Sequence, residues 1–475
     1  MMTDILIKNG FVITMEGSGA GVIEKGAVAV KGSVIEDVGP TDELEKKYRA
    51  HRVYDAEGKA VMPGLIDAHI HTSLALLRGI AQDTNNWLQK GIGPFKPHFI
   101  KDEIVKGSMM NILEGIKAGT TTFCDYDNPM TEIAENYLRI GARARIASMI
   151  NELPPDLHKL EIGELYPFDA SCGENMLMEN IKLIEEWHGR GNGRITCVFG
   201  PQGPDMLSRE LLLEIKHLAE KYDTKIYLHV AQGDREIDQM IKRYGRRSVE
   251  FLDEIGYLNE RLVAIHLTEA TKEEAQLIAK RGASMVHCPG SIGIIDGLVP
   301  PVLEFLDAGG TAALGSDQAP GNNCSNMFNE MKFAAILNKV KMGDPTVMPA
   351  WKVMRMATIE GAKAIGLENE IGSLRPGKKA DIIIVNMSEP GLCPVITRPV
   401  RNIVPNLVYS ARGHEVETVI IDGNIVMENR KVLTVNEKEV IYRAQKAAEG
   451  LALRAAEDFV NSGTKTVEMM EKGYL

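Results

Sequence analysis

The sequence predicts an α/β protein: a (β/α)8 TIM barrel with a small β-sandwich built from both chain ends. Between residues 62 and 370, short apolar strands alternate with longer helical segments. This alternation is typical of parallel βα units closed into a barrel. On either side of that region, alternating apolar and polar residues are broken by Gly, Asn and Asp. Such breaks indicate short strands joined by turns.

The composition is that of a globular protein and excludes several functional classes. The chain has 475 residues, 44% of them apolar and 25% charged, which is enough for several domains. The net charge of −11 argues against a nucleic-acid-binding surface. With no run of 18 apolar residues and no secretory signal, we expect no membrane partner and a cytoplasmic location. The six cysteines form no CxxC pair, which favours free thiols.

Four regions follow one another along the chain. Residues 1–61, with ILIKNGFVITM, GAVAVKGSVIEDVG and HRVYDAEGKAVMPG, form the N-terminal part of the sandwich. Residues 62–370 form the barrel, and residues 371–432, with RNIVPNLVYSA and VETVIIDGNIVMENRK, form the C-terminal part of the sandwich. Residues 433–475 have helical periodicity. The eight predicted barrel strands are 65–71, 120–126, 144–150, 194–200, 225–230, 262–266, 283–287 and 311–317. A long loop is predicted from residue 153 to residue 174, which makes the fourth unit the least regular.

Histidines and one aspartate stand at the ends of these strands. His69 and His71 end the first strand, His229 the fifth, His266 the sixth and Asp317 the eighth. The carboxyl ends of barrel strands converge on one face, where active sites form. Residues two apart in a strand point to the same side, so His69 and His71 both project into that face.

This set of side chains predicts a metal site. Imidazoles and one carboxylate suit a borderline divalent ion, and both Zn²⁺ and Fe²⁺ fit. Such an ion lowers the pKa of a bound water towards neutrality. A single His at a strand end is more often structural, but only 11 histidines occur in the chain, and four fall at these ends.

The motifs VMPGLIDAHIH, HVAQ, AIH and LGSDQA resemble the amidohydrolase superfamily. The most similar branch holds the triazine hydrolases and the methylthioadenosine/S-adenosylhomocysteine, guanine and cytosine deaminases. The resemblance extends over nearly the whole chain, through LLRGIAQD, AGTTTFCD and GSLRPGKKADIIIVN to VETVIIDGNIVMENR.

The resemblance implies one divalent metal per subunit, held by His69, His71, His229 and Asp317. His266 would contact the attacking water or the substrate, or serve as a further ligand, and Asp317 would also accept a proton from that water. RITCVFGPQGP at the fourth strand holds no lysine, so a carbamylated-lysine site with two metals is not expected. A homo-oligomer is expected from the resemblance.

The chain departs from the deaminase pattern at Gln232, the third residue after His229. Deaminases of this branch carry there a Glu that protonates the ring nitrogen and passes a proton to the leaving amine. An amide forms hydrogen bonds but does not titrate, so Gln232 weakens the case for ordinary deamination. Asp234 and Glu236 follow it, and both are expected to begin the next helix.

Positions that hold a ribose in the nucleoside deaminases also differ. Asn86 precedes Trp87 where an acid is usual, Gln202 replaces a His, and Ser148 stands where an Arg is usual. The resemblance therefore implies a smaller heterocycle, with Trp87, Asn86, Gln202 and His287 as candidate substrate contacts. For His287, a purely structural role at a strand end explains the residue equally well.

Three functions remain open from the sequence. The first is a mononuclear metal-dependent hydrolase that deaminates a pyrimidine, purine base, pterin or triazine, with His266, Asp317 and Gln232 at the reacting atoms. The second is ring opening of a cyclic amide by the same site, a reaction suggested by Gln232. The third is a binding protein without catalysis, which the complete metal-ligand set disfavours.

Overall fold

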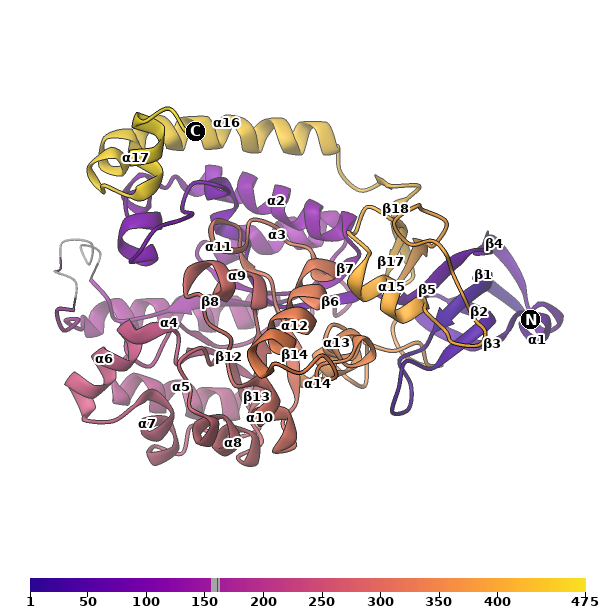
Figure 1. Ribbon diagram of the computed structural model, residues 1–475, viewed down its shortest axis with the longest axis horizontal. Helices are drawn as coiled ribbons and strands as arrows, with labels where there is room; N and C mark the ends of the chain where they lie inside the picture. Colours follow the sequence, from indigo (N-terminus) through magenta and orange to yellow (C-terminus); the bar gives the residue numbers. More distant parts are fainter. Residues whose placement is uncertain (155–159, 161–162) are drawn as a thin grey trace.

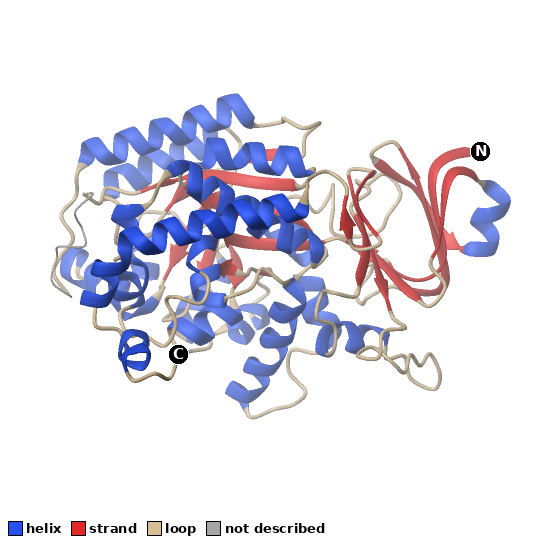
Figure 2. Cartoon of the chain, turned by 90° about the horizontal axis from the view of Figure 1, so that it is seen from above, coloured by secondary structure: helices blue, strands red, loops and turns tan. Residues whose placement is uncertain are grey.

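The computed structural model describes residues 1–154, 160 and 163–475. Two bodies lie side by side along the long axis: a barrel ringed by helices and an outer β-sheet that contains the N-terminus (Figures 1 and 2). None of the helices in these residues is both long enough and apolar enough to cross a membrane.

Eight parallel units close into the barrel. Its strands are β6 (Leu65–His71), β7 (Thr120–Asp127), β8 (Arg143–Ile150), β9 (Ile195–Cys197), β10 (Gly200–Pro201), β11 (Ile226–Val230), β12 (Leu262–His266), β13 (Ser284–His287), β14 (Ala312–Leu314) and β15 (Asp317–Gln318). They form one sheet around β6, β7 and β8 and a second from β11 to β14. A bridge from Phe199 to Ile226 joins the two sheets on one side, and β15 pairs with β6 on the other. The predicted barrel is therefore confirmed.

The fourth and eighth strands are each split in two. β9 and β10 are separated by Val198 and Phe199, and β14 and β15 by Gly315 and Ser316. The long loop predicted for residues 153–174 is partly wrong, because α4 begins at Ala170, where the Asp169 side chain accepts hydrogen bonds from two backbone amides of the first turn. Residues 155–159 and 161–162 of that prediction lie outside the described residues.

Helices surround the barrel, and others attach to the outer sheet and the C-terminal region. Those of the barrel are η1 (Thr72–Leu77), η2 (Trp87–Ile92), η3 (Lys96–His98), α2 (Lys101–Lys117), α3 (Met130–Ile140), α4 (Ala170–Trp187), α5 (Arg209–Lys221), α6 (Gly233–Tyr244), α7 (Ser248–Glu254), α8 (Lys272–Lys280), α9 (Pro289–Ile295), α10 (Val302–Asp307), α11 (Ala319–Asn322), α12 (Met327–Met342), α13 (Ala350–Met356) and α14 (Ile359–Ala364). The others are α1 (Thr41–Lys47), α15 (Ile403–Tyr409), α16 (Glu437–Asn461) and α17 (Lys465–Glu471). In Figures 1 and 2, α16 runs along the outside of the barrel, and its packing partners include α2.

Both chain ends build the outer sheet, as predicted. Its nine strands are β1 (Met2–Ile13), β2 (Val22–Lys31), β3 (Val34–Pro40), β4 (Arg49–Asp55), β5 (Lys59–Pro63), β16 (Ile382–Asn386), β17 (Val416–Ile421), β18 (Asn424–Glu428) and β19 (Lys431–Val432). The sheet curls until Val34 bridges to Lys379. The curl encloses an apolar core of its own, which includes Ile7, Val28 and Ile382.

Two local predictions for the outer parts of the chain need correction. Thr41–Lys47 is a helix within the region predicted as strands. Ile403–Tyr409, from the segment RNIVPNLVYSA, is also a helix, and its apolar residues Ile403, Val404, Leu407 and Val408 are buried on one face. Spacings of one, three and four residues fit a helix, and this tertiary burial outweighs the β-branched composition. The region after residue 432 holds two helices, α16 and α17.

A buried ion pair joins the two bodies. Arg143, at the start of β8, donates to both carboxylate oxygens of Asp381, at 2.7 and 3.1 Å. Asp381 precedes β16 in the outer sheet and also accepts from the backbone amide of Asp422 at 2.7 Å. Both charged side chains are only 3% exposed, so loss of either one leaves a buried charge without its partner.

We expect Arg143→Ala to lower the free energy of unfolding by about 3–5 kcal/mol, the range measured when one partner of a buried pair is removed. Arg139→Ala is the matched control, because Arg139 is exposed and its loss should change stability by less than about 0.5 kcal/mol. Urea unfolding followed by tryptophan fluorescence measures both. Equal midpoints for the two variants would contradict the structural role of the pair.

Candidate active site

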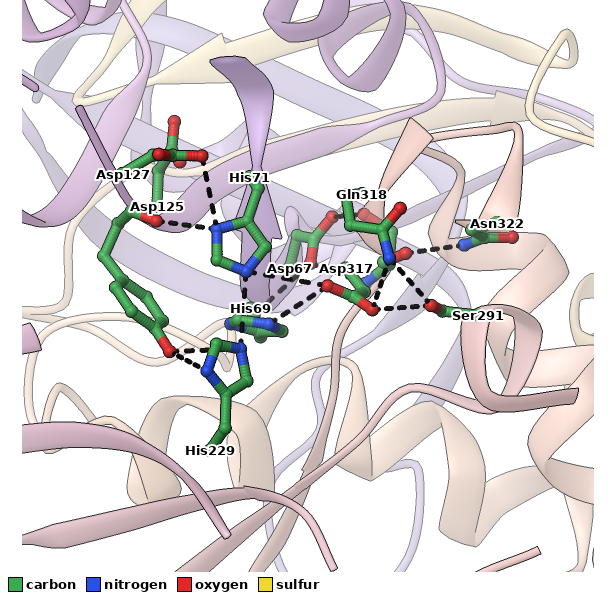
Figure 3. Close-up of polar contacts among 12 residues, drawn as sticks. Asp67, His69, His71, Asp125, Asp127, His229, Ser291, Asp317, Gln318 and Asn322 are labelled. Carbon is green, nitrogen blue, oxygen red and sulfur yellow. Dashed lines mark hydrogen bonds and ion pairs between the residues drawn. The ribbon is translucent and has the colours of Figure 1, made fainter. Parts of the chain in front are cut away.

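Four imidazoles meet at the carboxyl ends of the barrel strands, and Figure 3 shows those of His69, His71 and His229. The ring of His69 is centred 4.7 Å from that of His71, 5.0 Å from that of His229 and 5.3 Å from that of His266. The rings of His229 and His266 stack 5.1 Å apart and nearly parallel. All four histidines are buried. The side chains predicted as metal ligands are thus brought together.

Local backbone irregularities aim these side chains. The register between β6 and β7 shifts between Asp67 and Ile70, next to His69, and such bulges re-aim side chains near active sites. His266 has φ 77° and Asp317 φ 62°, both in the left-handed region that non-glycine residues adopt rarely. Strain of this kind is held by the surrounding structure and is concentrated at functional sites.

Hydrogen bonds determine which nitrogen two of the histidines present to the site. His71 donates from Nδ1 to the Tyr126 carbonyl at 2.7 Å. His229 donates from Nδ1 to the Gln202 carbonyl at 2.6 Å. The two Nε2 atoms then carry lone pairs and lie 3.4 Å apart. A carbonyl that fixes the ring of a metal-ligating histidine in this way is the usual arrangement in metalloproteins.

The two oxygens of the Asp317 carboxylate have different neighbours. Its Oδ1 lies 3.3 Å from Nε2 of His69 and 3.7 Å from Nε2 of His71. Its Oδ2 accepts from the Ser291 hydroxyl at 2.5 Å and from the Gln318 amide at 3.2 Å (Figure 3). Burial opposes ionisation, but the His69 imidazole at 3.3 Å and the other nearby imidazoles hold the pKa of Asp317 well below its usual range.

The cluster fits a divalent cation. Neither ring nitrogen of His69 or His266 has a hydrogen-bond partner among the described residues, and unpaired buried polar atoms are costly. Burial lowers the pKa of His69 to about 4 and that of His266 to about 3. Both rings are therefore neutral at pH 7 and have a lone pair to donate to a metal ion. Ligand atoms of His69, His71 and Asp317, and of His69, His229 and His266, lie within 4.8 Å of one another.

The candidate substrate contacts lie at different places. Gln202 faces the cluster with its carbonyl, which holds His229, while its side chain accepts from Asn151 at 2.8 Å. The Trp87 indole donates to the Pro320 carbonyl, 3.4 Å away, beside the end of β15. Asn86, which precedes Trp87, is exposed.

His287 ends β13 and lies near enough to His266 for its charge to lower the pKa of that imidazole. Burial lowers the pKa of His287 to about 3, with Lys341 of α12 as a charged neighbour. Its role in substrate binding stays a prediction.

Gln232 occupies the position directly before α6. It is half-buried, and its backbone amide donates to Glu236 Oε2 at 2.8 Å. Among the residues that the structure describes, no hydrogen bond is recorded for its side-chain amide, which leaves that amide available to a ligand.

Three residues around the cluster were not predicted. The Tyr126 hydroxyl lies 2.5 Å from His229 Nδ1, and Ser291 and Gln318 bind Asp317. The sequence could have indicated each of them, because Tyr126 ends a predicted strand, Gln318 directly follows another and Ser291 closely follows a third. Their types alone gave no signal, since Tyr, Ser and Gln are common in loops.

Comparisons with known proteins agree with this geometry. Residues 60–426 match the model of the amidohydrolase family. The chain is 36% identical over 455 residues to a protein named 5'-deoxyadenosine deaminase from Methanosarcina mazei, covering 95% of this chain and 99% of the relative. It is 35% identical over 455 residues to one named 5-methylthioadenosine/S-adenosylhomocysteine deaminase from Pelotomaculum thermopropionicum, covering 95% of this chain and 100% of the relative.

A solved structure is similar over the same length. The crystal structure of an adenosine deaminase from Xanthomonas campestris with bound zinc superposes with a TM-score of 0.87 at 29% identity, covering 95% of this chain and 99% of that one. The fold, the buried cluster of histidines and the matching family model point to one conclusion: this chain belongs to the amidohydrolase family.

Proposed function

We propose that the protein is a mononuclear metal-dependent aminohydrolase that releases ammonia from an amino-substituted N-heterocycle. The observation that carries the proposal is the cluster of four buried histidines around Asp317, two of them with unpaired ring nitrogens. The deaminase names of relatives 35–36% identical over nearly the whole chain support the reaction type. We assign Zn²⁺ as the metal, one per subunit, because the similar solved deaminase holds zinc; Fe²⁺ suits the same donors.

Each side chain of the cluster has a role in this proposal. The ion would be held by His69, His71, His229 and Oδ1 of Asp317. When bound, such an ion lowers the pKa of water and polarises the groups around it. Oδ2 of Asp317 receives the proton of the attacking water. His266, stacked on His229 with both nitrogens unpaired, either binds the oxygen that develops on the substrate or completes the ligand set. Gln232 hydrogen-bonds the heterocycle.

We propose a free base or another small heterocycle as the substrate, in contact with Trp87, Asn86, Gln202 and His287. The acid, the His and the Arg that hold a ribose in the nucleoside deaminases are replaced here by Asn86, Gln202 and Ser148, which favours a substrate without a ribose. Hydrolytic opening of a cyclic amide remains the alternative, because Gln232 does not titrate.

The proposal includes the surroundings of the enzyme. We place the protein in the cytoplasm as a homo-oligomer, with residues 62–370 as the catalytic domain, residues 1–61 and 371–432 as the outer domain, and residues 433–475 as a helical extension. All six cysteines are free, which supports a reducing compartment.

We expect His69→Ala and Asp317→Ala to lose both the bound divalent metal and the activity, because each removes a donor from the centre of the cluster. His287→Ala is the matched control: it also removes a buried histidine at a strand end, yet it should keep its metal. Elemental analysis of the purified variants measures the metal. An active, metal-free Asp317→Ala protein would overturn the site.

We expect the metal-loaded protein to release ammonia from at least one amino-pyrimidine, purine base, pterin or triazine while the ring chromophore is preserved. Ammonia assays with ultraviolet spectra recorded in parallel measure both. Adenine and 5'-deoxyadenosine belong in the same panel, and faster turnover of the nucleoside would overturn the assignment to a free base. Collapse of the chromophore without ammonia would replace deamination by ring opening.

A further inference from the structure

The proposed deamination needs a proton donor that Gln232 does not supply. Hydrolysis of an amino-heterocycle places negative charge on the ring nitrogen, and a general acid there accelerates the reaction by about 10²–10⁴-fold. The reaction therefore requires a carboxyl group that another element brings to the start of α6.

The two acids that follow Gln232 do not fill this role. Glu236 is buried and accepts from the Ala231 amide at 2.7 Å with one oxygen and from the Gln232 amide at 2.8 Å with the other. Both oxygens therefore face the backbone at the N-terminus of α6. Asp234 is exposed on the first turn of the helix.

Helix α9 leads from Asp317 to the start of α6. Near its N-terminus, the Ser291 hydroxyl donates to Asp317. At its last residue, Ile295 packs so closely on the loop after β15 that a Cβ atom on Gly321 would lie 2.8 Å from its Cδ1. The next residue is Asp296, whose Oδ1 lies 3.8 Å from the point that a Cβ atom on Gly233 would occupy. Asp296, in the segment after β13, thus reaches the residue next to Gln232 in the segment after β11.

The Asp296 carboxylate is half-buried and has no hydrogen-bond or ion-pair partner among the residues that the structure describes. Three buried acids around the cluster do have partners: Asp67 binds Ser316, Asp125 binds Thr72 and Asp205 binds Arg235. Keeping a half-buried carboxylate unpaired costs stability, and such groups are concentrated at functional sites.

We propose that Asp296 is the catalytic acid that protonates the ring nitrogen of the heterocycle, in place of the carboxyl group absent at Gln232. This inference rests on the proposed aminohydrolase function. It differs from the sequence pattern because the acid comes from the segment after β13, not from the segment after β11.

The proton balance of the reaction closes. The oxygen of water attacks the ring carbon that bears the amino group, and Asp317 takes one proton of that water. The electron pair of the C=N bond moves to the ring nitrogen, which takes the proton of Asp296. The amino nitrogen then takes the proton from Asp317, the C–N bond breaks, and ammonia leaves with the electron pair. As the carbonyl forms, the hydroxyl proton returns to the Asp296 carboxylate.

The surroundings of Asp296 suit a proton donor near neutral pH. Burial raises its pKa to about 6, and the charges of Asp317 on β15, Glu269 after β12 and Asp234 on α6 act in the same direction. Arg235 on α6 acts in the opposite direction. The acid must be protonated to donate, so its contribution to kcat falls as the pH rises above about 6.

The first experiment compares Asp296→Asn with the wild-type holoenzyme on the amino-heterocycle turned over fastest. We expect kcat to fall by about 10²–10⁴-fold, with unchanged metal content and unfolding midpoint, and with loss of the decline in kcat above pH 6. Asp234→Asn removes a neighbouring charge and should keep kcat within about twofold. Adding Gln232→Glu to Asp296→Asn should restore at least tenfold of the lost rate. Full activity of Asp296→Asn would overturn the assignment.

The second experiment needs no turnover. Hypoxanthine and uracil carry the ring N–H of a deamination product, and 1-methylhypoxanthine and 3-methyluracil lack it. Calorimetry should show that the wild-type holoenzyme prefers an unmethylated compound by at least tenfold and that Asp296→Ala loses this preference. No preference in the wild type, or no binding of any of the four, would overturn the role of Asp296. Preference without ammonia release from any compound would overturn deamination but keep Asp296 as the contact to the ring nitrogen.

Discussion

A two-residue pairing between the first and last strands brings the site together. Asp317 of β15 pairs with Ile70 and Gln318 with His71. This register closes the barrel and sets the Asp317 carboxylate against His69 and His71. A one-residue slip would turn the aspartate to the opposite face of the strand. The left-handed backbone at Asp317 is the local cost of this placement, and the surrounding packing offsets it.

The buried polar groups of the site lower the stability of the fold, whereas the barrel around them raises it. Below the histidines the interior is filled by apolar and small side chains such as Ile66, Val263 and Val286, all buried. That packing supplies the stability on which the unpaired imidazoles depend. The same apolar walls lower the pKa of the imidazoles and keep their lone pairs free at neutral pH. The apolar interior of the barrel thus supplies the stability, and the side chains at the strand ends supply the groups that can bind a ligand.

The sequence alone was sufficient to predict the features that follow from hydrophobic periodicity and from the residues at strand ends. The predicted strands 65–71 and 262–266 match β6 and β12 residue for residue, because a strand-length apolar run between turn signals leaves little freedom. The gathering of the four histidines and Asp317 follows from the strand ends in the same way. The helix at Ile403–Tyr409 was missed because its β-branched residues resemble a strand until tertiary burial selects one helical face.

Contacts between segments that are distant in the chain could not be predicted from the sequence. Nothing in the letters around Asp296 indicates that it lies beside Gly233, because that contact depends on the direction in which α9 leaves β13. The same holds for the carbonyl of Gln202, where the backbone and not the side chain holds His229. Sequence patterns identify residue types at strand ends, whereas the orientation of loops over those ends requires the fold.

The C-terminal helices have a consequence for the order in which the protein is assembled. Arg454 of α16 donates to the His98 carbonyl, and the Thr466 hydroxyl of α17 donates to the Gln82 carbonyl. Both acceptors lie in the segment between β6 and α2, which carries Trp87. During synthesis at the ribosome, this segment emerges more than 350 residues before the groups that fix it. The segment that holds Trp87 is therefore among the last parts of the molecule to become ordered, well after the barrel strands are available to pair.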